Sequence, residues 1–221
     1  MLMPKEKQLY QAPFQSSAAA VILAAGKSKR MGSAKMLLPW GDTSVLGYII
    51  KQWRALGVKQ ITVVSGNEEV NFELDRLGVP RENRIFNPEP ERGMFSSIQC
   101  AATWRGWGEL LTHWVIILGD QPQLLPPTLA QLLDFAALNP ERICQPLRHS
   151  HWRHPVVLPK SVFRQLSSSE AKTLREFLAG CDKSGFECED PGLDLDIDTP
   201  ADYQEVLKVF GGTGGTRTRD L

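Results

Sequence analysis

Short apolar runs alternate with amphipathic helical patterns along the first 140 residues of this 221-residue chain. A short apolar run is typical of a buried strand, and apolar residues spaced three and four apart are typical of a helix. The predicted strands are residues 19–24, 60–64, 84–86 and 113–118, and the predicted helices are residues 43–56, 68–77, 95–104 and 127–138. This order predicts an α/β three-layer sandwich, with a mostly parallel sheet and helices on both faces.

The pattern changes after residue 140. The expected elements are strands at 143–146 and 155–158 joined by a polar loop at 147–154, helices near 160–166 and 170–179, and a strand at 193–198 before a last helix. We interpret residues of about 143–190 as a substrate-side insertion within a single domain that spans residues 18–210. Residues 1–17 are predicted to be a flexible leader and residues 211–221 a flexible tail.

Composition limits the classes of partner. The chain has 25 basic and 25 acidic residues, so no overall field attracts nucleic acid or an anionic membrane. No apolar run approaches the ~18 residues of a membrane span. The four cysteines are scattered without a CxxC pair, which favours free thiols and a cytoplasmic protein. Because the basic and acidic residues balance, any anion-binding site must be formed by a local group of residues.

A basic loop follows the first predicted strand. Gly26 is followed by the cations Lys27, Lys29, Arg30 and Lys35. In an open α/β sheet, ligands bind at the carboxyl ends of the strands, where exposed backbone N–H groups and cations hold phosphates. The loop therefore indicates a site for a polyanion such as a triphosphate, and a basic surface turn is the alternative.

Two common phosphate-binding patterns do not fit this loop. A Walker A loop would need glycine at position 21, where the chain has Val21. The dinucleotide-binding pattern fails because Ser28 and Met31 replace its later glycines.

Asp120 follows the most apolar predicted strand, in Leu118-Gly-Asp-Gln-Pro122. A carboxylate in this position can hold Mg²⁺, which prefers one or two carboxylates together with phosphate oxygens. A turn or helix-capping aspartate is the alternative.

A second acidic pair, Asp196 and Asp198, lies in the predicted strand 193–198, where alternation would turn both carboxylates to the same side. A solvated strand face is the alternative to a metal site. The next residues favour a helix start with Thr199 as N-cap, Pro200 at the first helical position and Asp202 completing a capping box.

Two further segments carry candidate residues. Gly93, Ser96 and Ser97 open a predicted helix, and an ordinary helix cap is the simplest interpretation of their positions. Residues 149–154 contain three histidines without a cysteine, which is a weak zinc pattern. A solvated loop and contacts to a substrate are the other two interpretations of this segment.

Together these motifs resemble a known family. Leu23-Ala-Ala-Gly-x-Ser-x-Arg-Met-Gly-x-x-Lys35, continued by Leu37-Leu38-Pro39, is similar to the signature of the molybdenum-cofactor nucleotidyltransferases, and its acidic motifs recur here in the same order. The resemblance covers about residues 18–208 and is greatest to the cytidylyltransferases. It implies a Rossmann-like fold of the nucleotide-diphospho-sugar transferase type. It also implies transfer of CMP from CTP to the phosphate of molybdopterin, with a molybdenum hydroxylase as a recipient of the product.

The resemblance also implies roles for individual residues. The implied catalytic residues are Lys35, Arg30 and Asp120. The implied nucleotide-binding residues are Leu23, Ala24, Ala25, Gly26, Ser28, Arg30, Lys35, Gly93, Ser96 and Ser97. The implied ligands of Mg²⁺ or Mn²⁺ are Asp120 and Asp198, with Asp196 second.

Base and acceptor preferences follow from smaller differences. Ala25 favours CTP over GTP, because guanylyl relatives carry Leu-Ala-Gly-Gly, while Phe95 departs from the small residue of the family. His154 and Pro155 match a Gly-His-Pro-Val motif of acceptor contacts, in which Arg153 replaces the glycine. Arg153 either meets the acceptor phosphate or marks a different acceptor.

The implied chemistry needs no catalytic triad, because a phosphate nucleophile is already ionised at neutral pH and requires alignment and charge neutralisation instead. Two alternatives stay open. One is a nucleotidyltransferase that uses GTP or another acceptor, such as a sugar phosphate or methylerythritol phosphate. The other is a non-catalytic protein that binds and delivers molybdenum cofactor.

Overall fold

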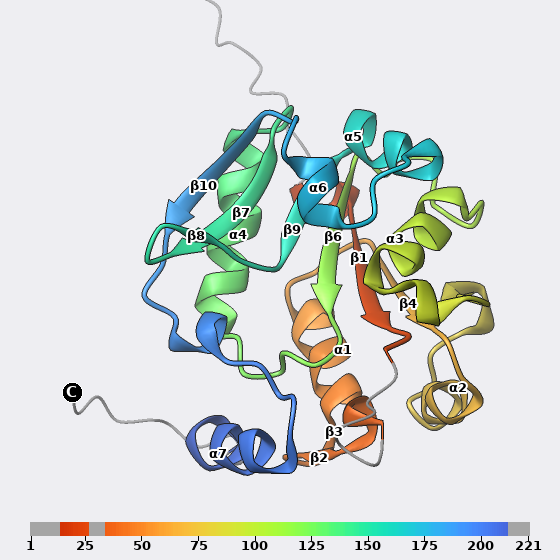
Figure 1. Ribbon diagram of the computed structural model, residues 1–221, viewed down its shortest axis with the longest axis vertical. Helices are drawn as coiled ribbons and strands as arrows, with labels where there is room; N and C mark the ends of the chain where they lie inside the picture. Colours follow the sequence, from red (N-terminus) through yellow and green to blue (C-terminus); the bar gives the residue numbers. More distant parts are fainter. Residues whose placement is uncertain (1–13, 27–33, 212–221) are drawn as a thin grey trace, which may run out of the picture.

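The computed structural model describes residues 14–26 and 34–211, and an eight-stranded sheet forms its centre (Figure 1). Seven strands follow the order β10-β7-β9-β6-β1-β4-β5, and the short β8 pairs with β7 outside this order. The strands are β1 (Ala18–Ala24), β4 (Gln60–Ser65), β5 (Arg84–Phe86), β6 (His113–Leu118), β7 (Ile143–Arg148), β8 (His151–Trp152), β9 (Val156–Pro159) and β10 (Lys183–Glu187).

Strand direction divides the sheet. β1 is parallel to β4 and β6, β4 is parallel to β5, and β7 is parallel to β10. β9 is antiparallel to both β6 and β7, with Val156 opposite Ile116. The mostly parallel sheet predicted from the sequence is confirmed. Because β9 runs the other way, its beginning lies at the same edge as the carboxyl ends of β1, β6 and β7.

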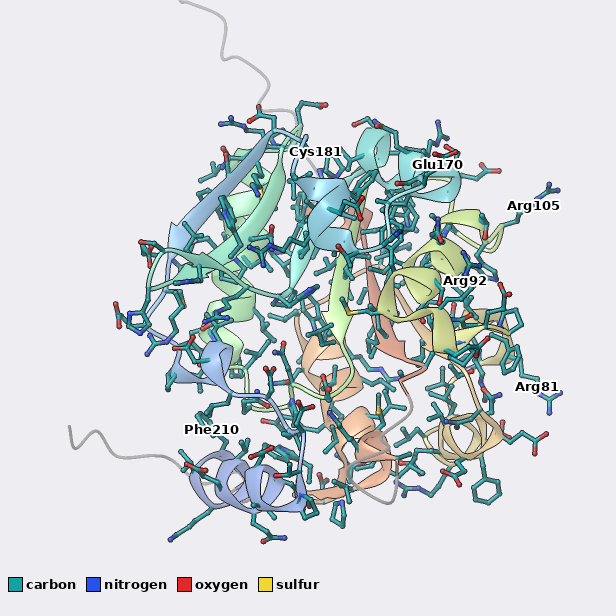
Figure 2. All side chains as sticks on the ribbon, in the orientation of Figure 1. Arg81, Arg92, Arg105, Glu170, Cys181 and Phe210 are labelled. Carbon is teal, nitrogen blue, oxygen red and sulfur yellow. The ribbon has the colours of Figure 1, made fainter. Side chains whose placement is uncertain are left out.

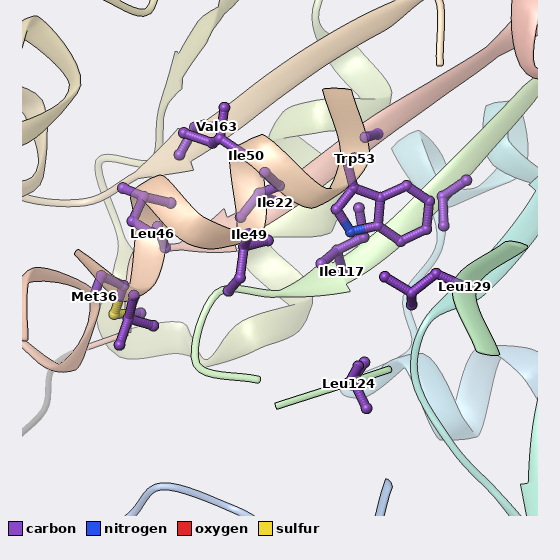
Figure 3. Packing of buried hydrophobic residues seen from close by; sticks show 14 of the residues in the cluster. Ile22, Met36, Leu46, Ile49, Ile50, Trp53, Val63, Ile117, Leu124 and Leu129 are labelled. Atoms are coloured by element: carbon purple, nitrogen blue, oxygen red, sulfur yellow. The ribbon is translucent and has the colours of Figure 1, made fainter. Parts of the chain in front are cut away.

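Helices cover both faces of the sheet. One layer contains α1 (Val45–Ala55), α2 (Glu68–Arg76), α4 (Pro126–Leu138) and α7 (Pro200–Phe210), and the other contains α3 (Met94–Thr103), α5 (Lys160–Gln165) and α6 (Leu174–Leu178). β1 is fully buried, and its residues alternate between the layers: Ile22 packs with the α1 layer and Val21 with the α3 layer. Figure 3 shows Ile22 and Ile117 packed near Ile49 and Trp53 of α1.

Helix caps confirm part of the local analysis. The Asn67 side chain accepts a hydrogen bond from Val70 N at the start of α2. Thr199, Pro200 and Asp202 form the predicted capping box at the start of α7. These caps satisfy backbone N–H groups that a helix start would otherwise leave unpaired.

Several elements differ from the predictions. The start of predicted helix 43–56 forms a small hairpin, β2 (Pro39–Trp40) with β3 (Thr43–Ser44), and only Leu174–Leu178 of 170–179 is α-helical. The predicted loop 147–154 contains β8, and β10 has no predicted counterpart.

The predicted strand 193–198 is wrong. This segment contains the end of η6 (Pro191–Asp194), followed by irregular backbone. The Leu195 carbonyl accepts from the Gln123 side chain rather than from the backbone of a neighbouring strand.

Part of the expected leader lies within the described residues. Its residues Phe14–Ser17 form the 3₁₀-helix η1, and the Phe14 ring lies 4.6 Å from the ring of His113. Residues 1–13, and 212–221 of the expected tail, lie outside the described residues. In the described part of the chain, no helix has the length and apolar character of a membrane span. Figure 2 shows Arg81 and Arg105 pointing away from the molecule, in keeping with dispersed surface charge.

Candidate active site

A cavity of about 450 Å³ opens at the carboxyl ends of β1 and β6. Three chain segments and Met36 form its wall. The lining residues are Leu23, Ala25 and Gly26 at the end of β1; Leu118, Gly119 and Asp120 at the end of β6; and Pro90, Glu91, Gly93, Met94 and Ser97 around the start of α3. The cavity therefore lies where an open α/β sheet binds ligands.

Two glycines allow these segments to approach one another. A Cβ atom on Gly119 would lie 2.6 Å from the Leu23 carbonyl oxygen, with which the Gly119 N–H forms a 3.0 Å hydrogen bond. A Cβ atom on Gly66, after β4, would lie 3.0 Å from the Ala25 Cβ atom and 3.1 Å from that of Pro90. Larger residues at either position would separate the walls of the cavity.

The start of α3 is held by a buried asparagine. Asn87 follows β5 and is 1% exposed, and its Nδ2 atom donates to Ser96 Oγ at 2.8 Å and Ser97 Oγ at 2.9 Å. Gly93 precedes the helix with a φ of +94°, a backbone conformation that favours glycine. Ser97 faces the cavity, while Ser96 donates to backbone carbonyls behind it.

Lys35 joins two distant acids. It begins the 3₁₀-helix η2 (Lys35–Leu37), and its Nζ atom lies 2.6 Å from Asp198 Oδ1 and 3.3 Å from Asp120 Oδ2. The Lys35 side chain is 13% exposed, so water screens these contacts only in part. The described residues thus bring together three side chains that lie 85 and 163 positions apart in sequence.

The titration of this cluster follows from its geometry. Burial lowers the pKa of Lys35, but the hydrogen bond that its ammonium donates to Asp198 and the negative charge of Asp120 outweigh burial and hold the pKa above its ordinary value. Burial raises the pKa of Asp120, and the Lys35 charge only partly opposes this. Asp198 is therefore the stronger partner of the ammonium, and Asp120 the more weakly paired carboxylate.

Asp198 reaches the site on residues 190–198, which comprise η6 and the irregular backbone after it and which we call the strap. Buried Gln123 donates from Nε2 to Gly192 O at 3.1 Å and Leu195 O at 2.7 Å. The Asp190 carboxylate accepts from the backbone N–H of Leu125 at 2.8 Å. These contacts replace the ladder of a strand, which explains why the predicted strand is absent.

The end of the strap places the two candidate acids differently. Ile197 is 1% exposed and anchors the strap in the core between Asp196 and Asp198. Asp196 is exposed and accepts from Gln121 Nε2 at 3.4 Å, whereas Asp198 binds Lys35.

The residues predicted to contact the acceptor, Arg153, His154 and Pro155, have different surroundings. Arg153 Nη2 lies 2.6 Å from Asp194 Oδ1, and Arg148 Nε lies 2.5 Å from Asp194 Oδ2. Both guanidinium groups thus bind one carboxylate of the strap. His154 Nδ1 lies 3.5 Å from Ile116 O, close to the end of β6, and Pro155 is buried directly before β9.

Three other residues predicted to bind the nucleotide are Ala24, Ser28 and Arg30. Ala24 is fully buried and faces the α1 layer, away from the cavity. Ser28 and Arg30 lie outside the described residues, so the structure gives no position for them.

The acids fit a divalent cation. Asp120 and Asp198 converge on one ammonium, which shows that two carboxylates and a cation can share this point. Within the described ranges, no cluster of three or more metal-ligating side chains occurs. Mg²⁺ commonly uses one or two carboxylates plus substrate phosphates, so this donor set suits it.

Sequence reasoning missed Asn87 and Gln123. Both are buried amides whose roles depend on carbonyl and hydroxyl groups far away in sequence. Neither belongs to a motif, and an isolated polar residue carries no periodic signal that could identify it.

Comparison with known proteins decides the family. The model of the MobA-like NTP transferase domain matches residues 20–185. This chain belongs to the MobA-like NTP transferase family. The molybdenum cofactor cytidylyltransferase of Escherichia coli (strain K12) is 28% identical over 186 residues, which cover 83% of this chain and 92% of that protein.

Solved structures agree on the fold. A nucleotidyl transferase from Methanothermobacter superposes with a TM-score of 0.72 at 19% identity, covering 88% of this chain and 97% of its own. A Mycobacterium tuberculosis protein, Rv0371c, in complex with manganese superposes with a TM-score of 0.64 at 24% identity, covering 87% and 98%. The chain is a nucleotidyltransferase of this family, with the expected three-layer α/β fold.

Proposed function

We propose that the protein transfers CMP from CTP to the phosphate of molybdopterin and releases pyrophosphate. The observation that carries the proposal is the convergence of Lys35, Asp120 and Asp198 beside a cavity lined by Ala25, Gly26 and Ser97. The similarity to a protein named molybdenum cofactor cytidylyltransferase supports the acceptor and the nucleotide. Ala25 in Leu-Ala-Ala-Gly supports CTP over GTP.

The nucleotide would lie across the cavity. The backbone of Leu23, Ala25 and Gly26 would contact its phosphates, together with Ser28 and Arg30, while Gly93 and Ser97 would face the ribose and base. Asn87 would fix the Ser97 hydroxyl from behind.

The reaction requires charge neutralisation rather than a base. An oxygen of the acceptor phosphate attacks the α-phosphorus in line, a new P–O bond forms, the bond between the α- and β-phosphates breaks, and pyrophosphate leaves with the electron pair. Lys35 and Arg30 would stabilise the added negative charge in the transition state. Asp120 and Asp198 would hold Mg²⁺ or Mn²⁺, which when bound neutralises further phosphate charge.

The acceptor would enter from the β9 side of the cavity. His154 and Pro155, at the beginning of β9, would contact it directly. Arg153 would act through Asp194 by holding the strap that carries Asp198.

A matrix of nucleotides against acceptors tests the proposal. Pyrophosphate release is measured with CTP, GTP, ATP and UTP against molybdopterin, a sugar phosphate and methylerythritol phosphate, with Mg²⁺ present. We expect the highest kcat/KM for CTP with molybdopterin. A higher value for GTP or for another acceptor would replace the proposed substrates, and binding of molybdopterin without pyrophosphate release from any nucleotide would favour a delivery protein.

A further inference from the structure

The strand β10 lies at one end of the sheet and has a neighbouring strand on one side. Among the described strands it pairs with β7 alone (Figure 1). Just before β10, the Asp182 carbonyl accepts from Ile143 N at 3.3 Å. Just after β10, Cys188 N donates to Leu147 O at 2.9 Å. Residues that bond to the same parallel neighbour are two positions apart, so the even-numbered positions of β10 face β7.

The odd-numbered residues of β10 face the outer edge of the sheet. Lys183, Gly185 and Glu187 therefore direct their backbone N–H and C=O groups away from β7. No residue in the described ranges forms a hydrogen bond with these groups. An open strand edge of this kind is a template for pairing with another strand.

The side chains along this edge are self-complementary. When two copies of β10 lie antiparallel about a twofold axis at Gly185, Lys183 lies directly opposite Glu187 of the second copy, and the reverse pair forms on the other side of the axis. Directly opposed residues share one face of the sheet, with Cβ atoms about 5 Å apart, so each ammonium can reach a carboxylate. The same register brings every outward N–H to an outward C=O of the second copy.

Both charged groups are available for such a pair. In the described chain, neither Lys183 nor Glu187 forms an ion pair: the Lys183 Nζ atom lies 4.7 Å from the centre of the Trp152 ring, and Glu187 Oε1 accepts from the exposed Ser150 N–H at 3.2 Å. Four positions along a strand separate the two residues by about 13 Å, too far for them to pair with each other. The formal charge of the chain is zero, so two copies do not repel each other overall.

Exposed apolar surface lies beside the same axis. The Trp152 indole rests against Gly185, where a Cβ atom would lie 2.8 Å from Trp152 Cζ3, and Trp152 is 40% exposed. With Gly185 on the axis, the indoles of two copies would flank it on one face, and pairing would cover part of their exposed surface. Tryptophan is enriched in the buried centre of protein interfaces.

The opposite end of the sheet lacks this complementarity. Asn87 N donates to Ser65 O at 2.8 Å, so Arg84 and Phe86 of β5 direct their backbone groups outward. An antiparallel pair of β5 strands would oppose Arg84 with Phe86 or with a second Arg84, and with no acid. The two ends of the sheet therefore differ in their fitness to pair with a second copy.

We propose that β10 joins two copies of this chain by antiparallel pairing about Gly185, so that one continuous sheet runs through a symmetric dimer. The inference goes beyond the proposed function and does not depend on which nucleotide or acceptor the protein uses. Because the strap begins shortly after β10, the pairing would also fix the start of the segment that carries Asp198.

Charge reversal tests the register. Lys183→Glu and Glu187→Lys each oppose like charges on both sides of the axis, and each should raise the Kd of the dimer about 5- to 100-fold in sedimentation equilibrium. Lys51→Glu changes the net charge of the chain by the same amount as Lys183→Glu, on α1, and should leave the Kd unchanged. Circular dichroism verifies that each variant is folded.

Mixing the two variants gives the sharpest result. An equal mixture of Lys183→Glu and Glu187→Lys opposes two acids of one chain with two lysines of the other, so the mixed dimer should be about as tight as wild type. A mixture no tighter than either variant alone would overturn the register.

Amide hydrogen exchange of the wild-type protein provides a test without substitution. The amides of Lys183, Gly185 and Glu187 should exchange more slowly at high than at low protein concentration, whereas those of Ser184 and Phe186, which face β7, should change much less. A wild-type protein that stays monomeric at every concentration would overturn the proposal. A dimer whose outward amides exchange at the same rate as in the monomer would overturn it too, because its interface would lie elsewhere.

Discussion

The two halves of the sheet build their parts of the site in different ways. In the half of the sheet proposed to hold the nucleotide, which we call the nucleotide half, β1, β4 and β5 run parallel, and the small residues Ala25 and Gly26 directly after β1 line the cavity. In the half proposed to hold the acceptor, which we call the acceptor half, β9 is antiparallel, and the side chains of Arg148, Arg153 and Gln123 hold the strap. A cavity wall formed at the ends of strands is positioned by the order of those strands. A segment held by side chains is positioned only when each of those side chains has its hydrogen-bond or ion-pair partner.

The largest loss of activity is expected for substitution of Lys35, which lies where the two halves of the sheet meet. Lys35→Ala removes the cation between Asp120 and Asp198, and kcat should fall about 10²- to 10³-fold, as when one preorganised charge-stabilising group is lost. The measurement is steady-state pyrophosphate release with CTP and molybdopterin. Lys51→Ala breaks the exposed ion pair between Lys51 of α1 and Asp42 of the β2–β3 turn and should leave kcat unchanged. A folded Lys35→Ala protein with near-normal kcat would remove this cluster from the reaction.

A smaller loss of activity is expected when the strap is loosened by substitution of Gln123. Gln123→Ala removes one buried and one partly buried hydrogen bond and should lower the free energy of unfolding by about 2–4 kcal/mol. It should also lower kcat about 10-fold, because a loosened strap misplaces Asp198. Urea denaturation and kcat at a temperature where both proteins are folded check the two effects.

Gln165→Ala is the control for the strap, since it removes an exposed hydrogen bond within α5. It should change neither quantity. If Gln123→Ala lowers stability but leaves kcat intact, the strap supports the fold without positioning the acid.

The smallest effect is expected for His113, at the edge of the sheet opposite the cavity, and it concerns the pH dependence of stability. Burial lowers the pKa of His113 below its ordinary value of 6.5, and His113 Nε2 lies 2.8 Å from Pro140 O. The unfolded chain therefore binds the proton more readily than the folded protein. The His113 contribution to stability is complete above pH 6.5 and is lost as the pH falls through the lowered pKa.

His113→Phe should remove this part of the pH dependence. Its free energy of unfolding should lie below that of wild type at pH 8, and the gap should narrow toward pH 5. Urea denaturation across this range measures the gap, and kcat at pH 8 should be unchanged because His113 lies far from the carboxyl edge. A gap that stays constant with pH would show that the folded protein accepts the His113 proton as readily as the unfolded chain.

The same contrast explains what the sequence could predict. β1 and β6 are apolar runs whose neighbours follow from strand order, so the positions of Gly26 and Asp120 at one edge could be inferred. The Thr199 cap is also local, because all its partners lie within four residues. These features depend on periodicity and short spacing, which a single sequence displays.

The structure of the acceptor half could not be predicted in the same way, because it depends on contacts between residues far apart in sequence. β10 was missed because Lys183–Glu187 places only Phe186 in a core, so it lacks the alternation of a half-buried strand. The alternation of Leu193, Leu195 and Ile197 with acids predicts a strand, yet the Gln123 side chain binds the carbonyls of Gly192 and Leu195. The partner of Arg153 was equally hidden, since Asp194 lies 41 positions away.

The reversed direction of β9 has a consequence for how such a protein can diversify. The β7–β8 hairpin and the turn into β9 form an excursion that leaves and re-enters the sheet at the reaction edge, with Cys144 and Val157 paired at its base. Lengthening a surface excursion costs little loop entropy and leaves the register of β1, β4 and β6 untouched. Grafting a different hairpin between these fixed strands is therefore a direct route to a new acceptor on an unchanged nucleotide half.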